Sequence, residues 1–223
     1  DALFVRQEAK KAGLPCMIGK ADTISFAKRR GLSLEDAARR LRYRFLEQLA
    51  QRIGASRVAV GHTLDDQAET LLLNFLRGTG PDGLAGMSFK RAMGAGSCVL
   101  IRPLLETSRR EIETYCRQKK LWPRFDKSNM DMRFLRNKIR LELLPYLEKE
   151  YNPNIRKSLA RLSELINADR DYLQRLATQR LVEIIIREKP RRLELDVKSL
   201  LCEHDSLQGR ILRRAISRLL WQG

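Results

Sequence analysis

A dense group of side chains able to do chemistry lies in one stretch, His62-Thr-Leu-Asp-Asp-Gln-Ala-Glu-Thr70. The stretch follows Arg57-Val-Ala-Val-Gly61, a short apolar run that predicts a buried strand ending in a glycine turn. It precedes Leu71-Leu-Leu-Asn-Phe-Leu76, which has the bulk and length of a core helix. Open α/β sheets bind ligands at the carboxyl ends of such strands. A histidine and several carboxylates at this place indicate a site for binding and proton transfer.

Three acids lie at the start of the predicted helix. Thr63 and Asp66 have the spacing of a capping box, which would begin the helix there. Asp66 and Glu69 are three residues apart, and Asp65 and Glu69 are four apart, so the acids would share one helix face. Alternatively, they only decorate a helix N-terminus, where the helix dipole favours negative charge. We favour a functional site, because carboxylates without basic partners beside His62 indicate function.

The elements around this motif alternate between helix and strand. The helix predicted over 33–52 is the strongest, because its apolar residues keep helical spacing between a Ser33 cap and a Gly54 stop. Further helices are expected over 1–13, 64–77 and 107–120, and strands over 16–19, 57–61 and 99–101. This alternation predicts an α/β fold with a doubly wound, mostly parallel sheet. Its usual first strand and phosphate-binding turn do not occur in the sequence, so we expect the domain to be amino-terminally incomplete.

Beyond about residue 145 the pattern becomes mainly helical. It predicts a long amphipathic helix over 155–188, an alternating strand over 192–197 and a basic helix over 207–221. We therefore predict two domains. The first is an α/β catalytic domain over 1–144, and the second is a smaller, mainly helical domain over 145–223 that could hold RNA.

The chain is strongly basic, which favours a polyanionic partner. Its formal net charge is +17 and its pI is near 10.3, values that are extreme for an enzyme of small metabolites and that fit nucleic acid or, less often, an anionic membrane surface. Basic residues are dense over 117–140, where interleaved aromatic side chains could stack on unpaired bases. Arg133, Arg136 and Arg140 fall at helical spacing and would form one basic face. The alternative is a solvated linker whose aromatic side chains pack inward.

Two other classes of protein are disfavoured. The sequence has no long uncharged apolar stretch and no visible signal peptide, so we expect no membrane span. Its four cysteines are scattered without a C-x-x-C pair, which argues against a zinc ribbon, an iron–sulfur site or a dithiol and suits a reducing cytoplasm. We predict a cytoplasmic protein without a metal site built from its side chains.

Several motifs, taken in order, resemble those of the tRNA(Ile)-lysidine synthetase family, a group of N-type ATP pyrophosphatases. The resemblance runs from about residue 5 to residue 175. It rests on the stretch from Val58 to Thr70, Arg77-Gly-Thr-Gly80, Gly83-Leu-Ala-Gly-Met87, Arg102-Pro-Leu-Leu105, Asp126-Lys-Ser-Asn129 and Arg136-Asn-Lys-Ile-Arg140. This family joins the ε-amine of free L-lysine to C2 of the wobble cytidine in tRNA(Ile) with a CAU anticodon, forming lysidine.

The resemblance implies two chemical steps. ATP first adenylates the C2 oxygen of cytosine and releases pyrophosphate; the lysine amine then attacks C2, and AMP departs. In the family, counterparts of Arg42, His62, Asp66 and Glu69 line the pocket between ATP and the target base. Arg42 and His62 would act on phosphate charge, with Gly61 beside His62 at the nucleotide. Asp66 and Glu69 would orient the lysine amine or take its proton.

The resemblance also implies the cofactors and partners. ATP and Mg²⁺ would be required, and the RNA-binding residues would be Arg133, Arg136, Asn137 and Arg140. A homodimer is left open. The family's Ser-Gly-Gly-x-Asp-Ser loop, which cradles pyrophosphate and helps to hold Mg²⁺, does not occur in the sequence, and we attribute the gap to truncation or disorder ahead of Asp1.

Two rival functions remain at this point. One is a tRNA thiolase of the same superfamily, although those enzymes generally use paired cysteines. The other is a noncatalytic basic RNA-binding module, which would not require Arg42, His62, Asp66 and Glu69 to converge. For the synthetase, replacing Asp66 or Glu69 with Ala should abolish lysine transfer while the fold persists, because exposed acids at a helix start contribute only about 1 kcal/mol.

Overall fold

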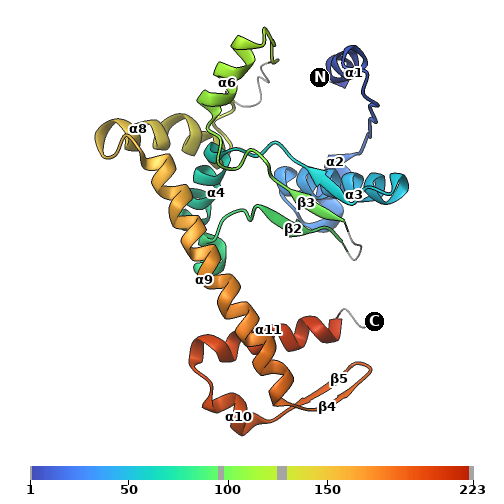
Figure 1. The fold of residues 1–223 in the computed structure, drawn as a ribbon, viewed down its shortest axis with the longest axis vertical. Helices are drawn as coiled ribbons and strands as arrows, with labels where there is room; N and C mark the ends of the chain where they lie inside the picture. The colour runs from blue at the N-terminus through green and yellow to red at the C-terminus, as the bar shows by residue number, and fades with distance from the viewer. Residues whose placement is uncertain (1, 95–97, 125–129, 221–223) are drawn as a thin grey trace. The chain divides into compact units, whose positions relative to one another are not determined.

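The computed structural model describes residues 2–94, 98–124 and 130–220 (Figure 1). The chain forms two compact units. The first unit comprises residues 1–66 and 88–141, and the second comprises residues 67–87 and 142–223. The predicted division at 144/145 assigned 67–87 to the catalytic domain, whereas this segment groups with the second unit. The motif Asp126-Lys-Ser-Asn129 lies outside the described residues.

A small mixed sheet forms the centre of the first unit. Its strands are β1 (Arg57–Ala59), β2 (Lys90–Ala92) and β3 (Val99–Ile101), in the order β1-β3-β2. β1 pairs with β3 in parallel, with Val58 opposite Leu100, but β2 pairs with β3 antiparallel. The expected mostly parallel sheet is therefore not what the described residues form. The short β2–β3 connection explains the difference, because a parallel pair needs a crossover of a dozen or more residues.

Helix α3 (Leu34–Ile53) covers this sheet. Ser33 caps its first turn by accepting a hydrogen bond from the Asp36 amide, and Gly54 ends it in the left-handed conformation at φ 67°, as predicted. Tyr43 and Leu46 of α3 pack on a core that includes Leu100, which is fully buried. The other helices of this unit are α1 (Ala2–Lys11), α2 (Thr23–Arg30), which lies beside α3, α6 (Arg109–Gln118) and α7 (Leu135–Lys138).

The strand predicted over residues 16–19 is wrong. This segment is irregular and runs between α1 and α2 (Figure 1). Gly19 lies directly against the Phe45 ring of α3, where an added Cβ would stand 2.7 Å from a ring carbon. The apolar run thus packs on a helix instead of pairing with a strand.

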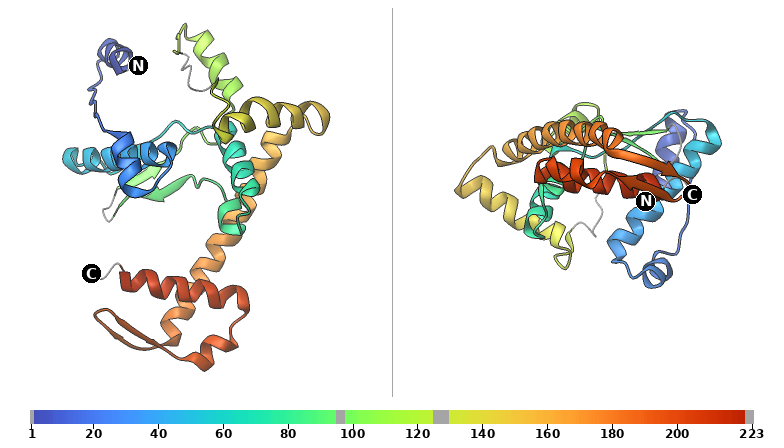
Figure 2. Two further views of the ribbon diagram at one scale, coloured as in Figure 1. Left: turned by 180° about the vertical axis from the view of Figure 1, so that it is seen from behind. Right: turned by 90° about the horizontal axis from the view of Figure 1, so that it is seen from below.

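The second unit is mainly helical, as the pattern predicted. Helix α9 (Ile155–Ile184) and helix α11 (Asp205–Leu220) pack together around a core that includes Leu181 and Ile211 (Figure 2). Helix α5 (Pro81–Leu84) also contacts α9. Helix α8 (Leu144–Glu150) precedes α9 and follows a π-helical turn over Ile139–Leu143, and α10 (Val197–Cys202) precedes α11.

The long helix predicted over 155–188 ends earlier, at Ile184. Residues Ile185–Lys189 form strand β4, which pairs antiparallel with β5 (Arg192–Leu195). Arg191 adopts φ 60° at the turn between the two strands. The run Ile184-Ile-Ile186 is β-branched and favours a strand once a partner strand is available.

Helix α4 (Leu64–Leu76) carries the acidic motif, and its first residues belong to the first unit. The second unit begins at Gln67 of α4. The side chain of Gln67 fixes the position of the segment 83–87 by hydrogen bonds. This side chain accepts from the Met87 amide at 2.8 Å and donates to the Met87 carbonyl at 3.1 Å and to Ser163 Oγ at 2.6 Å. Gly86 sits beside these groups at φ 58°. Gln67 therefore has a structural task within the motif.

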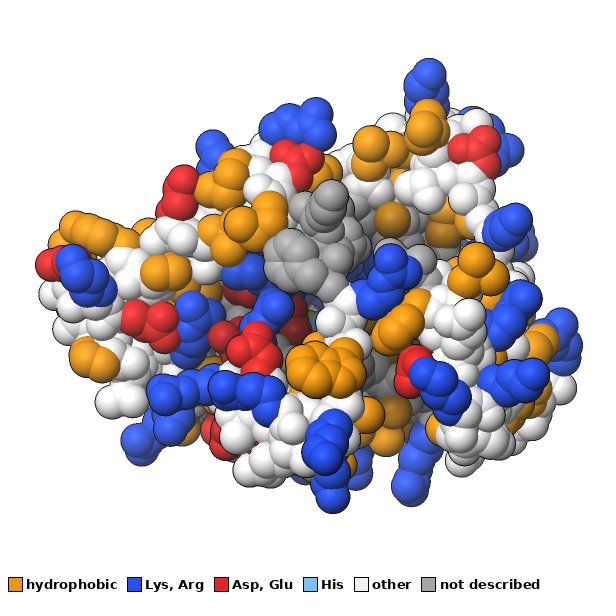
Figure 3. All heavy atoms as spheres, turned by 90° about the horizontal axis from the view of Figure 1, so that it is seen from above, with side chains coloured by type: hydrophobic (Ala, Val, Ile, Leu, Met, Phe, Trp, Pro, Cys, Tyr) orange, Lys and Arg blue, Asp and Glu red, His pale blue; other side chains and the backbone are white. Residues whose placement is uncertain are grey.

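Positive charge is not confined to one segment. Lys and Arg side chains are spread over the face drawn in Figure 3, among hydrophobic side chains. Charge density alone therefore does not locate the RNA-binding surface that the sequence predicts. Over the described ranges, no helix is both long and apolar enough to cross a bilayer.

Candidate active site

His62 lies where the motif predicted, at the carboxyl edge of the parallel pair β1 and β3. Beyond the last paired residue of β1, the Val60 amide donates to the Ile101 carbonyl of β3 at 3.0 Å. Gly61 and His62 then lead into α4, and an added Cβ on Gly61 would meet open space. Arg102 directly follows β3, so the two strand ends bring His62 and Arg102 together.

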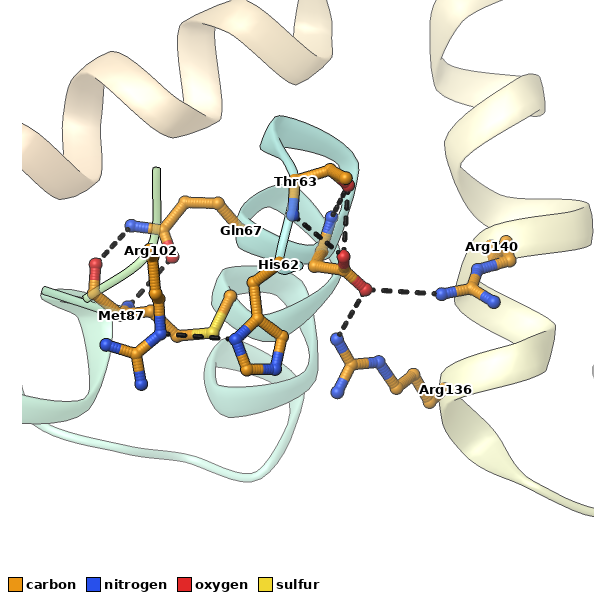
Figure 4. Close-up of polar contacts among 8 residues, drawn as sticks. His62, Thr63, Gln67, Met87, Arg102, Arg136 and Arg140 are labelled. Carbon is orange, nitrogen blue, oxygen red and sulfur yellow. Dashed lines mark hydrogen bonds and ion pairs between the residues drawn. The ribbon is translucent and has the colours of Figure 1, made fainter. Parts of the chain in front are cut away.

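Arg102 holds the imidazole of His62 (Figure 4). Its Nε donates to His62 Nδ1 at 3.2 Å, and its terminal nitrogen donates to the Ser88 carbonyl at 2.6 Å. Arg102 is 2 % exposed, and burial lowers its pKa below the usual range of an arginine, partly offset by the charge and hydrogen bond of Tyr43. Because a guanidinium has only donors, neutral His62 must accept at Nδ1 and carry its proton on Nε2.

The surroundings of His62, above all its burial, favour this neutral form. Burial is the largest cause that lowers the pKa of His62 below 6.5; Asp66 raises it, and Arg102, Arg136 and Arg39 lower it. A neutral His62 with a proton on Nε2 can donate a hydrogen bond to developing negative charge. Sequence reasoning did not identify Arg102 as a site residue, although it stands in the motif Arg102-Pro-Leu-Leu105.

Asp66 is enclosed by donors. Its carboxylate accepts from the Thr63 amide at 2.9 Å and the Thr63 hydroxyl at 3.0 Å, which confirms the predicted capping box with the Asp66 amide bonded back to Thr63. It also pairs with Arg136 at 3.2 Å and Arg140 at 3.4 Å (Figure 4). The expectation that these carboxylates lack basic partners is therefore wrong for Asp66.

The predicted basic face of Arg133, Arg136 and Arg140 is not formed as expected. Arg136 and Arg140 are four residues apart along α7 and the π-helical turn, so they share the face that meets Asp66. Arg133 lies in a turn before α7 and pairs with Asp131 at 2.7 Å with most of its side chain in solvent. A side chain outside the helix does not follow helical spacing.

Asn137 is buried within the same region. It is 8 % exposed, and its Nδ2 donates to the Asp131 carbonyl at 2.8 Å. This contact ties α7 to the turn that precedes it. The RNA contact expected of Asn137 stays a prediction.

The other two acids of the motif have separate surroundings. Asp65 accepts a hydrogen bond from the Arg109 amide at 2.7 Å and so caps the start of α6, a structural role. Glu69, one turn beyond Asp66 on α4, is fully buried and belongs to the second unit. The view of Asp66 and Glu69 as exposed acids is therefore wrong, and their removal would cost stability.

Arg42 was expected to act beside His62. It is exposed on α3. The α3 arginine whose charge acts on His62 is Arg39, one turn earlier. The role expected for Arg42 at the phosphates stays a prediction.

Comparison with known proteins identifies a family and similar proteins. A family model described as a PP-loop domain matches residues 1–147. The tRNA(Ile)-lysidine synthase of Clostridioides difficile is 36% identical over 220 residues, which are 99% of this chain and 46% of the relative. The proteins of the same name from Caldanaerobacter subterraneus subsp. tengcongensis and Thermosynechococcus vestitus are 37% and 38% identical, over 96% and 87% of this chain and 44% and 54% of their own lengths.

The chain thus spans about half the length of the curated relatives that it matches. The family match covers the whole first unit, including β1, β3 and the His62 and Asp66 contacts built on them. On these grounds the chain belongs to the PP-loop domain family.

Proposed function

We propose that this protein uses ATP to join lysine to C2 of the wobble cytidine of tRNA(Ile) with a CAU anticodon. The observation that carries the proposal is the neutral His62, held by Arg102 at the carboxyl edge of β1 and β3 beside the paired Asp66. The identity to tRNA(Ile)-lysidine synthases over nearly the whole chain supports the choice of substrates. A PP-loop domain implies the use of ATP.

The proposed reaction needs groups that stabilise negative charge and a group that accepts a proton. Adenylation of the C2 oxygen breaks the α–β phosphate bond and releases pyrophosphate, so the site must stabilise charge on phosphate oxygens. Attack by the lysine ε-amine then forms the C–N bond, and AMP leaves with the former C2 oxygen. One carboxylate or water must take the proton that the amine loses.

His62 suits the first of these tasks. Its Nε2–H can donate to phosphate or C2 oxygen charge without changing protonation state, because Arg102 occupies Nδ1. Arg42 would supply a full positive charge to the phosphates. In nucleotide sites Mg²⁺ is held mainly by phosphates, waters and one or two carboxylates. Over the ranges that the structure describes, no group of three His, Cys, Asp or Glu side chains is placed to bind a metal.

The acids take different parts in this proposal. Asp66 is engaged by Thr63, Arg136 and Arg140, so we assign it to positioning these arginines and the start of α4. Glu69 would hold the lysine ammonium or take its proton, a role that requires its fully buried carboxylate to become accessible to the substrate. Contacts of Arg133, Arg136, Asn137 and Arg140 with RNA, a cytoplasmic location and a homodimer also remain proposals.

The test is transfer of radiolabelled lysine by the full-length protein to tRNA(Ile) with a CAU anticodon, with ATP and Mg²⁺. His62→Asn keeps an acceptor for Arg102 but removes the Nε2 donor, so it should slow transfer about 100-fold or more, the typical cost of one lost oxyanion donor. His62→Gln can restore a donor near Nε2 and should recover part of the rate. The matched control is His204→Asn, which changes the exposed histidine of the second unit and should leave the rate unchanged.

Two results would reject the proposal. The first is no label in the tRNA from the wild-type protein under any ATP concentration. The second is incorporation of sulfur from labelled cysteine in place of lysine, which would indicate a tRNA thiolase.

A further inference from the structure

A cavity of about 620 Å³ opens on the first unit between α3 and β2. Four arginines line it, three from α3 and Arg91 from β2, together with Tyr43 and two acids. The α3 residues follow helical spacing, so one face of the helix forms the wall; they are Asp36, Arg39, Arg40, Tyr43, Arg44 and Glu47. The excess of guanidinium groups makes this an anion-attracting cavity.

The cavity arginines outnumber the two acids beside them and, over the described ranges, are not held in ion pairs. Among the described residues, no ion pair joins Arg39, Arg40, Arg44 or Arg91 to a carboxylate, whereas Arg136 and Arg140 are held on Asp66. All four cavity arginines are exposed. The cavity guanidinium groups are thus available to a ligand, whereas Asp66 engages Arg136 and Arg140.

Tyr43 gives the cavity an aromatic centre. Arg91 and Arg39 lie over its ring, with their guanidinium carbons 5.1 and 5.8 Å from the centroid. Guanidinium planes held in this way can stack on unpaired bases and also bind phosphate. The Tyr43 hydroxyl bonds to Arg102, the residue that holds His62, so the cavity borders the candidate active site.

We propose that this arginine cavity binds the phosphodiester backbone of a single-stranded RNA segment next to the target nucleotide. A nucleotide triphosphate is the less suitable ligand. Triphosphates are usually cradled by backbone N–H groups of a glycine-rich loop or a helix N-terminus. The cavity is instead lined by long side chains from the flank of a helix and from a strand. The proposal rests on the proposed function only for the identity of the RNA.

The test compares two triple variants of the full-length protein that lose the same charge. The cavity variant is Arg40→Gln, Arg44→Gln and Arg91→Gln, which leaves Arg39 near His62 untouched. The control is Lys28→Gln, Arg30→Gln and Arg52→Gln, which removes exposed charges of α2 and the α3 end. Binding of the tRNA(Ile) anticodon stem-loop is measured by fluorescence anisotropy from 50 to 200 mM salt.

The cavity variant should bind RNA more weakly and with a flatter salt dependence. Each phosphate contact on a single strand contributes about 0.7 to the slope of log K against log salt, so three lost contacts reduce it by about 2. Over a fourfold rise in salt, wild-type affinity should then fall about 20-fold more than that of the variant. The control variant should keep at least most of the wild-type slope.

Equal slopes in the two triple variants would overturn the proposal. So would a cavity variant that loses ATP affinity without RNA present but keeps its RNA affinity, because the cavity would then bind nucleotide. A flattened slope in the cavity variant, together with no lysine transfer by the wild-type protein, would reject the proposed function but support this RNA site. Thermal unfolding checks that the fold of each variant is intact, since exposed substitutions usually change stability by less than about 0.5 kcal/mol.

Discussion

Asp66→Asn should destabilise the protein markedly, although the side chain keeps its size. The carboxylate pairs with Arg136 and Arg140 at 3.2 and 3.4 Å, and the three side chains are 21%, 24% and 22% exposed. Asn retains an oxygen that can still accept from the Thr63 amide. The substitution therefore removes mainly the negative charge between two guanidinium groups.

The expected cost lies between two limits. Exposed ion pairs contribute about 0–1 kcal/mol, and breaking a buried pair costs about 3–5 kcal/mol. For partly buried groups we expect a loss of about 2 kcal/mol in the free energy of unfolding. For a chain of this size that corresponds to a fall in Tm of about 4–8 °C.

Chemical denaturation and thermal melting of Asp66→Asn measure this loss, and Asp36→Asn is the matched control. Asp36 forms the same type of box with Ser33, at 3.0 and 3.1 Å, at the exposed start of α3. Its substitution should cost less than about 0.5 kcal/mol. Equal losses in the two variants would refute the reasoning, because the arginine pairs would then contribute nothing measurable.

Two further predictions concern His62 and Gly86. Burial lowers the pKa of His62 below 6.5, so as the pH falls the unfolded chain binds a proton before the folded protein does. The stability that neutral His62 contributes is therefore complete above pH 6.5 and is lost as the pH falls below this value. Urea unfolding across this range should show a stability loss that His62→Asn reduces, and identical pH profiles would contradict the assignment. Gly86→Ala should cost about 2–3 kcal/mol, because φ is 58° and a Cβ would stand 2.7 Å from Ser163 Oγ. Gly78→Ala has similar strain at φ 73° but open space around its Cβ, so denaturation should show a smaller loss; equal losses would exclude the clash.

Local signals predicted much of the structure near the site. The Ser33 cap and Gly54 stop of α3 and the Thr63–Asp66 box lie within three to five residues of the turns that they define, and each formed as expected. Strands β1 and β3 were likewise visible as short apolar runs. These features depend on neighbours in the chain, which the sequence shows directly.

The missed features depend on partners far away in the chain. Arg136 and Arg140 reach Asp66 across 70 and 74 residues, and Arg102 reaches His62 across 40. No periodic pattern reports such contacts. The early end of α9 has the same origin, because Ile185 leaves the helix to pair with Leu195 in the neighbouring strand.

The hydrogen bond from Arg102 also limits what the imidazole can do. An imidazole relays a proton only when one nitrogen can gain a hydrogen while the other gives one up. The nitrogen facing Arg102 is blocked by a group that keeps its hydrogens throughout the biological pH range. His62 is therefore a fixed dipole and not a shuttle, and in the proposed reaction the hydrogen lost by the lysine amine would depart through a carboxylate or solvent.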